Sequence, residues 1–272
     1  MDHKQTCIPK ADRAPQHQKA VEVSLGAASD AGVAGVMHLA VQGDDAAQCN
    51  LGIMHLEGRG VVRSDEEAAQ WFRKAAEQGH AEAQCNLAVL FLDGCGVVKS
   101  DTEAVRWFRK AADQGHVNAQ FNLGNMLERG HGVVKSDTEA VRWYKKAANQ
   151  GDSGAQFDLG RMLENGRGVT QSYTEAIHWY SKAAEQGEAD AQCNLGVMHL
   201  EGRCVAQSDA MAARWFQKAA DRGHADAQCN LGIMHLEGRG VAQSDAMAAR
   251  WFRKAADQGH TKADLLSAGL EA

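Results

Sequence analysis

Cysteine and histidine recur in this chain at a fixed interval, and both side chains can bind metals or act in catalysis. Four of the seven cysteines share one place in a 36-residue interval: Cys49, Cys85, Cys193 and Cys229. Three of these are followed six residues later by a histidine: His55, His199 and His235. Residues six apart on a helix point to different sides, whereas zinc ligands must converge on one point within about 2.0–2.3 Å. We therefore expect no metal site and no cofactor.

A catalytic set cannot be assembled from the remaining residues either. The chain has no G-x-S-x-G elbow, no P-loop and no glycine-rich dinucleotide turn, which are the short motifs that carry a mechanism. Cys95 and Cys204 lie in turns where other copies of the repeat hold Arg, His or Gly. No basic residue recurs beside both, so sequence drift is favoured over a redox-active thiol. The sequence predicts a protein without catalytic residues.

The 36-residue interval belongs to a repeat that occurs six times without insertion or deletion. Its copies span residues 45–80, 81–116, 117–152, 153–188, 189–224 and 225–260. All six tryptophans fall at repeat position 27: Trp71, Trp107, Trp143, Trp179, Trp215 and Trp251. A period of this length indicates one helix-turn-helix unit stacked on copies of itself. The predicted fold is an all-α solenoid.

Each copy is predicted to hold two helices, here called helix A (positions 1–12) and helix B (positions 21–34). Two glycines in the turn separate them, and a glycine at position 35 suits a left-handed helix cap. In the first four copies the serine at position 20 precedes a glutamate by three residues, which is typical of a capping box. Helix B has one apolar stripe that contains the tryptophan and the next aromatic residue, so both are expected in the core.

The residues outside the six copies are predicted to cover the ends of the stack. Residues 30–44 align with a degenerate helix B, and residues 261–272 with the start of a seventh helix A. Residues 1–29 contain both prolines and few large apolar residues, which predicts a disordered tail. We expect the histidines that follow the capping glycines to be solvated: His80, His116, His224 and His260. The histidines at position 11 (His55, His199, His235) are expected to pack against helix B.

Composition excludes several classes of partner. A formal net charge of −6 and a pI near 6.0 argue against nucleic acid and anionic membranes, which require a basic surface. No apolar run approaches 18 residues, and the N-terminus lacks the apolar core of a secretory signal. With an odd number of cysteines, these features predict free thiols and a cytoplasmic location.

The side of helix A formed by positions 2, 5, 6, 9, 12 and 13 is the predicted binding surface. At positions 5, 9 and 12 it carries apolar residues in copies 1, 2, 5 and 6, but aromatic, polar and charged residues in copies 3 and 4. A helix that is apolar on nearly all sides is either enclosed or presents a binding face. We therefore expect a concave groove that binds a partner peptide or helix. Its predicted lining is Cys85, Asn86, Val89, Phe121, Asn122, Asn125, Glu128, Phe157, Asp158, Arg161, Glu164, Cys193 and Asn194.

The run AEAQCNLAVLFLDGCGVVKSDTEAVRWFRKAADQG resembles the Sel-1-like repeat, a relative of the tetratricopeptide repeat. The shared pattern is A-x-x-x-L-G, then G-x-G-V, then A-x-x-W-[FY]-x-K-A-A-x-x-G, and it extends over all six copies. The resemblance implies a right-handed α-solenoid that acts as an adaptor or scaffold. In related tetratricopeptide units, an asparagine that matches position 6 can hydrogen-bond the backbone of a bound peptide. The alternative is that these asparagines bond to a neighbouring repeat.

A cysteine-rich branch of this family has been linked to β-lactam binding or hydrolysis. That branch pairs a cysteine near the end of helix B with one in the next helix A, and no helix B of this chain ends in a cysteine. The leading hypothesis is therefore a non-enzymatic protein-protein interaction scaffold. The alternatives are a hydrolase of the cysteine-rich branch and an array that regulates an associated enzyme.

Overall fold

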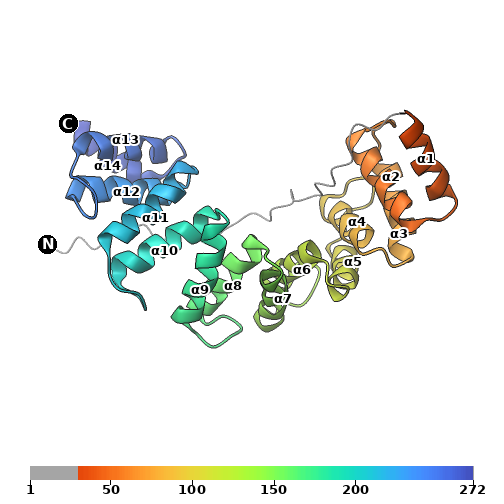
Figure 1. Cartoon of the computed structure of the whole chain (residues 1–272), viewed down its shortest axis with the longest axis horizontal. Coiled ribbons are helices and arrows are strands. Elements are labelled where there is room, and N and C mark those ends of the chain that lie inside the picture. Colours follow the sequence, from red (N-terminus) through yellow and green to blue (C-terminus); the bar gives the residue numbers. More distant parts are fainter. Residues whose placement is uncertain (1–29, 272) are drawn as a thin grey trace. The chain divides into compact units, whose positions relative to one another are not determined.

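The computed structural model describes residues 30–271, and within this range the chain forms fourteen α-helices and no strand (Figure 1). The described residues divide into an N-terminal unit, 30–152, and a C-terminal unit, 153–271. The predicted disordered tail, residues 1–29, lies outside the described residues. The helices of the N-terminal unit are α1 (Asp30–Val41), α2 (Asp45–Glu57), α3 (Asp65–Glu77), α4 (Ala81–Asp93), α5 (Asp101–Asp113), α6 (Val117–Arg129) and α7 (Asp137–Asn149). Those of the C-terminal unit are α8 (Ser153–Asn165), α9 (Tyr173–Glu185), α10 (Ala189–Glu201), α11 (Asp209–Asp221), α12 (Ala225–Glu237), α13 (Asp245–Ala256) and α14 (Thr261–Glu271).

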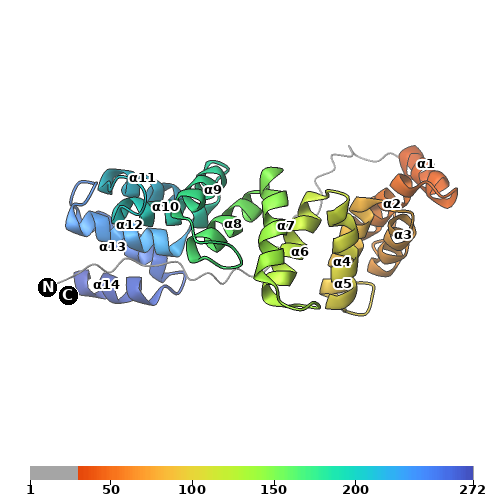
Figure 2. The ribbon, with the colours of Figure 1, turned by 90° about the horizontal axis from the view of Figure 1, so that it is seen from below.

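Within each unit the helices pack in chain order, each on the one before and the one after it (Figure 2). The even-numbered helices α2 to α12 are the predicted helices A, and the odd-numbered helices α3 to α13 are the predicted helices B. The all-α solenoid predicted from the period is confirmed.

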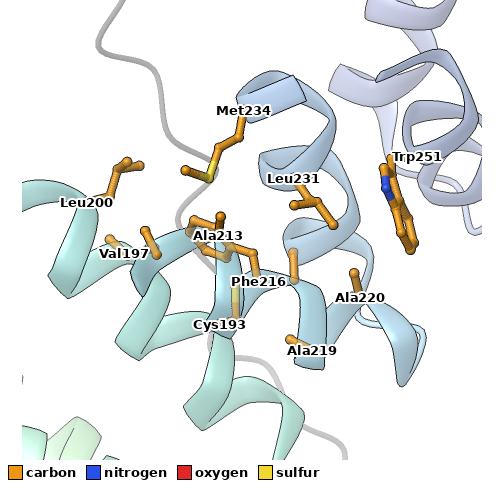
Figure 3. Close-up of a cluster of buried hydrophobic side chains, with 12 residues drawn as sticks. Cys193, Val197, Leu200, Ala213, Phe216, Ala219, Ala220, Leu231, Met234 and Trp251 are labelled. Atoms are coloured by element: carbon orange, nitrogen blue, oxygen red, sulfur yellow. The ribbon is translucent and has the colours of Figure 1, made fainter. Parts of the chain in front are cut away.

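Helices A and B of one repeat approach closely through a small residue at position 8. A Cβ atom added to Gly52 would lie 2.7 Å from the ring of Phe72, which is fully buried. Only copy 2 has alanine here, Ala88. In the C-terminal unit, Phe216 lies among alanines of its own helix and Leu231 of the next helix A (Figure 3). The aromatic residue at position 28 therefore fills the space between consecutive repeats.

The tryptophans are only partly in the core. Trp107, Trp179 and Trp251 are buried at 5%, 7% and 4% exposure, whereas the other three are half-buried. In every copy the lysine three residues later places its Nζ over the indole ring, 3.7 to 4.8 Å from the centroid. One face of the ring thus packs inward and the other makes a cation–π contact.

Within each unit, a buried glutamine at position 4 joins helix A to the preceding helix B, as Gln48, Gln84, Gln120, Gln192 and Gln228 show. Gln84 Nε2 donates to the carbonyl of Ala76 at 3.0 Å, and Gln84 Oε1 accepts from Gln114 Nε2 at 2.8 Å. In copies 1, 3, 4 and 6 the glutamine at position 34 likewise donates through its Nε2 to the Oε1 of the glutamine at position 4. Copy 5 has Arg222 at that position, and there Gln192 Oε1 is buried without a partner.

The serine caps of helix B form only half of the predicted capping box. Ser64 Oγ accepts from the backbone N–H of Glu67 at 3.2 Å, as predicted. The N–H of Ser64, however, donates to the carbonyl of His55 at the end of helix A, not to a glutamate. This bond recurs in every copy, so the glutamate is dispensable and Met211 and Met247 can replace it.

The histidines at position 36 are not solvated, and that prediction is wrong. Each is half-buried, and its Nδ1 accepts from the backbone N–H three residues later, so it caps the next helix A. His224 and His260 also contact Asp190 and Asp226 through Nε2, at 3.1 and 3.0 Å. Imidazole accepts this backbone bond only when Nδ1 is unprotonated.

Replacing Arg222 by Gln should stabilise the protein. The new amide can reach Gln192 Oε1, as Gln258 reaches Gln228 in copy 6, and one such bond contributes about 0.5–1.5 kcal/mol. Urea unfolding followed by tryptophan fluorescence measures the change. The reverse substitution, Gln258→Arg, should lower the midpoint, and two unchanged midpoints would contradict this account of the glutamine contacts.

The helix cap formed by His116 also predicts a loss of stability in acid. Burial, with a smaller contribution from His80, lowers the pKa of His116 below 6.5. A depressed pKa means that this stability is present above about pH 6.5 and is lost as the pH falls through the folded pKa. His116→Asn keeps an acceptor that does not titrate. Thermal unfolding between roughly pH 7 and pH 5 should therefore show a smaller loss in the variant than in the wild type; equal losses would exclude the role of this cap.

Candidate functional site

The cysteines at position 5 form a buried base under the predicted binding surface of the N-terminal unit. Cys49 and Cys85 are 2% and 4% exposed. Burial, with Glu82 nearby, raises the pKa of each thiol to about 12. A thiol with so high a pKa is a poor nucleophile and a poor metal ligand. Val89, also in the predicted lining, is half-buried on α4, the helix that carries Cys85.

The asparagines at position 6 of the N-terminal unit have no bonded side-chain partner. Asn50, Asn86 and Asn122 lie one repeat apart on α2, α4 and α6 and are half-buried. Within residues 30–271, none of their carboxamides makes a hydrogen bond. A half-buried amide that makes no bond to protein retains donors and an acceptor for a ligand.

The matching residues of the C-terminal unit are bonded within the protein. Asp158 is 7% exposed and pairs with Arg161, whose Nη2 and Nε lie 3.0 and 3.2 Å from Asp158 Oδ1. Asn194 hydrogen-bonds the hydroxyl of Tyr180 in the preceding helix B. Asn230 is 2% exposed and is also engaged. In the C-terminal unit Asn194 thus bonds to a neighbouring repeat, which is the structural alternative, and peptide binding by the asparagines stays a prediction.

Copy 3 has a polar cluster in the N-terminal unit. The hydroxyl of Tyr144 lies 2.8 Å from Glu128 Oε2 and 3.1 Å from Asn125 Oδ1. Glu128 is 8% exposed and Tyr144 is fully buried. The ring of Phe121 lies against that of Tyr144, with the centroids 6.0 Å apart. Phe121, Asn125 and Glu128, all predicted site residues, are thus brought together around one tyrosine.

Copy 4 has the matching cluster in the C-terminal unit. The Tyr180 hydroxyl donates to Glu164 Oε2 at 2.7 Å, and Arg203 Nη1 lies 3.4 Å from Glu164 Oε1. The ring of Phe157, 7% exposed, lies 5.7 Å from that of Tyr180. Burial and then the Glu164 carboxylate raise the pKa of Tyr180 well above its usual value. This tyrosine therefore stays a neutral hydrogen-bond donor.

The two tyrosines were absent from the predicted lining, although the sequence contains a signal for them. Position 28 is tyrosine only in Tyr144 and Tyr180, the two copies whose position 12 is glutamate. The other four copies pair phenylalanine at position 28 with leucine at position 12. Positions 12 and 28 face each other across helices A and B. Copies 3 and 4 therefore have a carboxylate and a hydroxyl together where the other copies have two apolar groups.

Within residues 30–271, the remaining histidines and cysteines do not form a metal-binding cluster. His55 and His235 bond the carbonyls of Val62 and Ala242 in the turn after helix A, at 3.1 and 3.2 Å, and so hold that turn. The sequence predicts that His55 and His235 pack against helix B, and the contact that the structure shows for them is this hydrogen bond to the turn. Cys95 is half-buried, and Cys204 is exposed with a φ of +53° where most copies have glycine. No cysteine within residues 30–271 forms a disulfide bond.

The Sel1 repeat model matches residues 45–80, 81–116, 117–152, 153–188, 189–224 and 225–260, which is most of the chain. The chain belongs to the Sel1 repeat family. Its repeats thus have the fold of a general scaffold for protein interactions. No helix within residues 30–271 is long and apolar enough to cross a membrane.

Two solved structures are similar over most of the chain. One is a protective antigen of uropathogenic Escherichia coli with an SLR fold: 36% identity, TM-score 0.82, covering 86% of this chain and 50% of that one. The other is a Sel1 repeat protein from Oxalobacter formigenes: 38% identity, TM-score 0.76, covering 88% of this chain and 69% of that one. The chain spans half the length of the E. coli antigen. No curated protein matches the chain significantly.

The tyrosine–glutamate pairs should be energetically coupled. Tyr144→Phe removes the hydroxyl that faces the buried Glu128 carboxylate and should destabilise the fold by about 1–3 kcal/mol. Adding Glu128→Leu recreates the pair of the other copies and should recover part of this loss. A double-mutant cycle in urea measures the coupling; additive effects would show that the hydroxyl and the carboxylate act independently.

Proposed function

We propose that this Sel1 repeat protein is a non-enzymatic adaptor that binds an extended segment of a partner protein along the helix A side of its N-terminal unit. The observation that supports this most directly is the row of three half-buried asparagines whose side chains bond to no other residue of the described range 30–271. They occur once per repeat, so their carboxamides can meet a peptide backbone at successive points. Backbone amides offer both a donor and an acceptor, which a carboxamide can match.

Apolar side chains beside the asparagines would contribute affinity. Ile53 and Leu56 follow Asn50 on α2, and Val89 and Leu92 follow Asn86 on α4. Ile53 is 5% exposed, and the other three are half-buried, so part of their surface is available. A partner segment with small or apolar side chains would bury this surface, while its backbone bonds to the asparagines.

Polar groups in copy 3 of this unit would contribute specificity, and those in copy 4 form a separate candidate surface on the C-terminal unit. Asn125 and Phe121 are half-buried beside Tyr144, and Arg161 and Glu164 are half-buried beside Tyr180. Charged groups already paired within the protein disfavour a ligand that would break those pairs. An Arg161→Glu substitution would also place a second carboxylate beside Asp158, so it tests the ion pair together with binding.

A catalytic role receives no support from the described thiols. The hydrolase alternative requires disulfide-paired cysteines, whereas Cys49, Cys85, Cys193 and Cys229 are buried and form no disulfide. The exposed, free Cys204 suits a reducing compartment, and we propose the cytoplasm.

Replacing Asn86 and Asn122 together by Ala should weaken peptide binding without unfolding the protein. The probe is the tightest synthetic peptide from a random 12-residue library selected on the wild type, with affinity measured by calorimetry. Two lost hydrogen bonds of about 0.5–1.5 kcal/mol each predict a dissociation constant roughly 5- to 150-fold larger.

Asn194→Ala is the matched control, because Asn194 bonds to Tyr180. It should lower the unfolding midpoint and leave the affinity unchanged. Wild-type affinity in the Asn86→Ala/Asn122→Ala variant would refute the proposed contacts. A lower unfolding midpoint in that variant would show that these asparagines are structural.

A further inference from the structure

Glu82 adds a charge to the row of asparagines in the N-terminal unit. It lies four residues before Asn86 on α4, and residues four apart share one face of a helix. Its side chain is half-buried, and within residues 30–271 its carboxylate makes no hydrogen bond and no ion pair. Copies 1 and 3 have Ala46 and Asn118 at this repeat position, position 2, so Glu82 is the one carboxylate at position 2 in the repeats of this unit.

The carboxylates at position 2 of the C-terminal unit are already paired. Asp190 Oδ1 lies 3.1 Å from Nε2 of His224, the histidine at position 36 of the same copy. The same pair recurs in copy 6 at 3.0 Å. Copy 2 has a histidine at position 36 too, but His116 caps α6 through its Nδ1 and makes no bond to Glu82. The carboxylate and the asparagine are thus both engaged in copy 5, and in copy 2 neither bonds to another residue of the described range.

The charge of Glu82 acts on both helices that carry the first two asparagines. After burial, the Glu82 carboxylate is the largest cause of the raised pKa of Cys49 on α2 and of Cys85 on α4. Since the interaction between charges weakens with distance, the carboxylate lies near the base of the predicted binding surface on both helices. A segment that crosses α2 and α4 beside the asparagines therefore meets this charge.

No lysine or arginine of α2 or α4 neutralises this charge. The two helices contain Asp45, Glu57, Glu82 and Asp93, and neither Lys nor Arg. Glu57 contacts Arg59 in the turn that follows α2, whereas Glu82 has no such partner. A half-buried carboxylate has lost part of its hydration, and a cation that bonds to it compensates for this loss. The surface is therefore complementary to a positive charge.

We propose that Glu82 selects a lysine or arginine side chain in the partner segment that the asparagines bind, an inference that rests on the proposed function. Helix geometry, with a rise of about 1.5 Å per residue, places Glu82 about 6 Å along α4 from Asn86. A segment that crosses α4 at Asn86 therefore reaches the carboxylate with a long side chain and not with its backbone. Lysine and arginine have both the length and the charge, whereas an acidic segment would be rejected.

Peptides selected from the random 12-residue library test the role of Glu82. Those selected on the wild type should share a Lys or Arg at one register, and those selected on Glu82→Lys should share an Asp or Glu there. Glu82→Gln should raise the dissociation constant of a peptide selected on the wild type roughly 3- to 10-fold, between the effects of exposed and of buried ion pairs. This loss should vanish when the basic residue of the peptide is itself replaced by Gln, because no pair is then left to break. Copy 1 has Ala46 at this position, so folding should be retained.

Glu77→Gln is the matched control, because Glu77 is exposed on α3 and the substitution removes the same charge. It should leave the affinity unchanged. Selected peptides that share no basic residue, equal affinities of Glu82→Gln and the wild type, or an equal loss in Glu77→Gln would each overturn the inference and leave the proposed function standing. A wild type that selects no peptide would overturn both.

Discussion

The buried glutamine at position 4 is the contact on which the stacking of repeats depends. In copy 2, Gln84 links the end of one helix B, its own helix A and the following helix B through two hydrogen bonds of about 3 Å. A buried amide must satisfy its donor and its acceptor together, so it fixes the spacing of three helices at once. Apolar contacts at positions 8 and 28 fill the volume, but they tolerate exchange, as Ala88 and the tyrosines show.

Departures from the repeat come in pairs across helix contacts. Tyrosine accompanies glutamate in copies 3 and 4, because the hydroxyl and the carboxylate satisfy each other. The tyrosine in turn decides what happens one repeat later, since Tyr180 takes up the carboxamide of Asn194. A tyrosine at position 28 can thus take up the asparagine of the next repeat, although Asn230, which follows Phe216, is also buried and engaged.

Much of the fold could be predicted from the 36-residue period, because glycines, serine caps and aromatic residues at fixed positions act locally. The availability of the asparagines could not, since Asn86 and Asn194 share a repeat position, and only the surroundings in the fold, such as the Tyr180 hydroxyl beside Asn194, distinguish them. The histidine caps were missed for a related reason. A histidine after a glycine is equally compatible with solvent and with an N-cap, and only the path of the next helix distinguishes them.

The most direct test of the central claim, that the side chains of Asn50, Asn86 and Asn122 contact a bound segment, is a titration followed by NMR. The signals of the asparagine side-chain NH2 groups are recorded while a selected peptide is added. We expect the signals of these three residues to shift, and those of Asn194 and Asn230, already bonded in the protein, to stay in place. Shifts confined to Asn194 and Asn230, or spread equally over all five, would contradict the account.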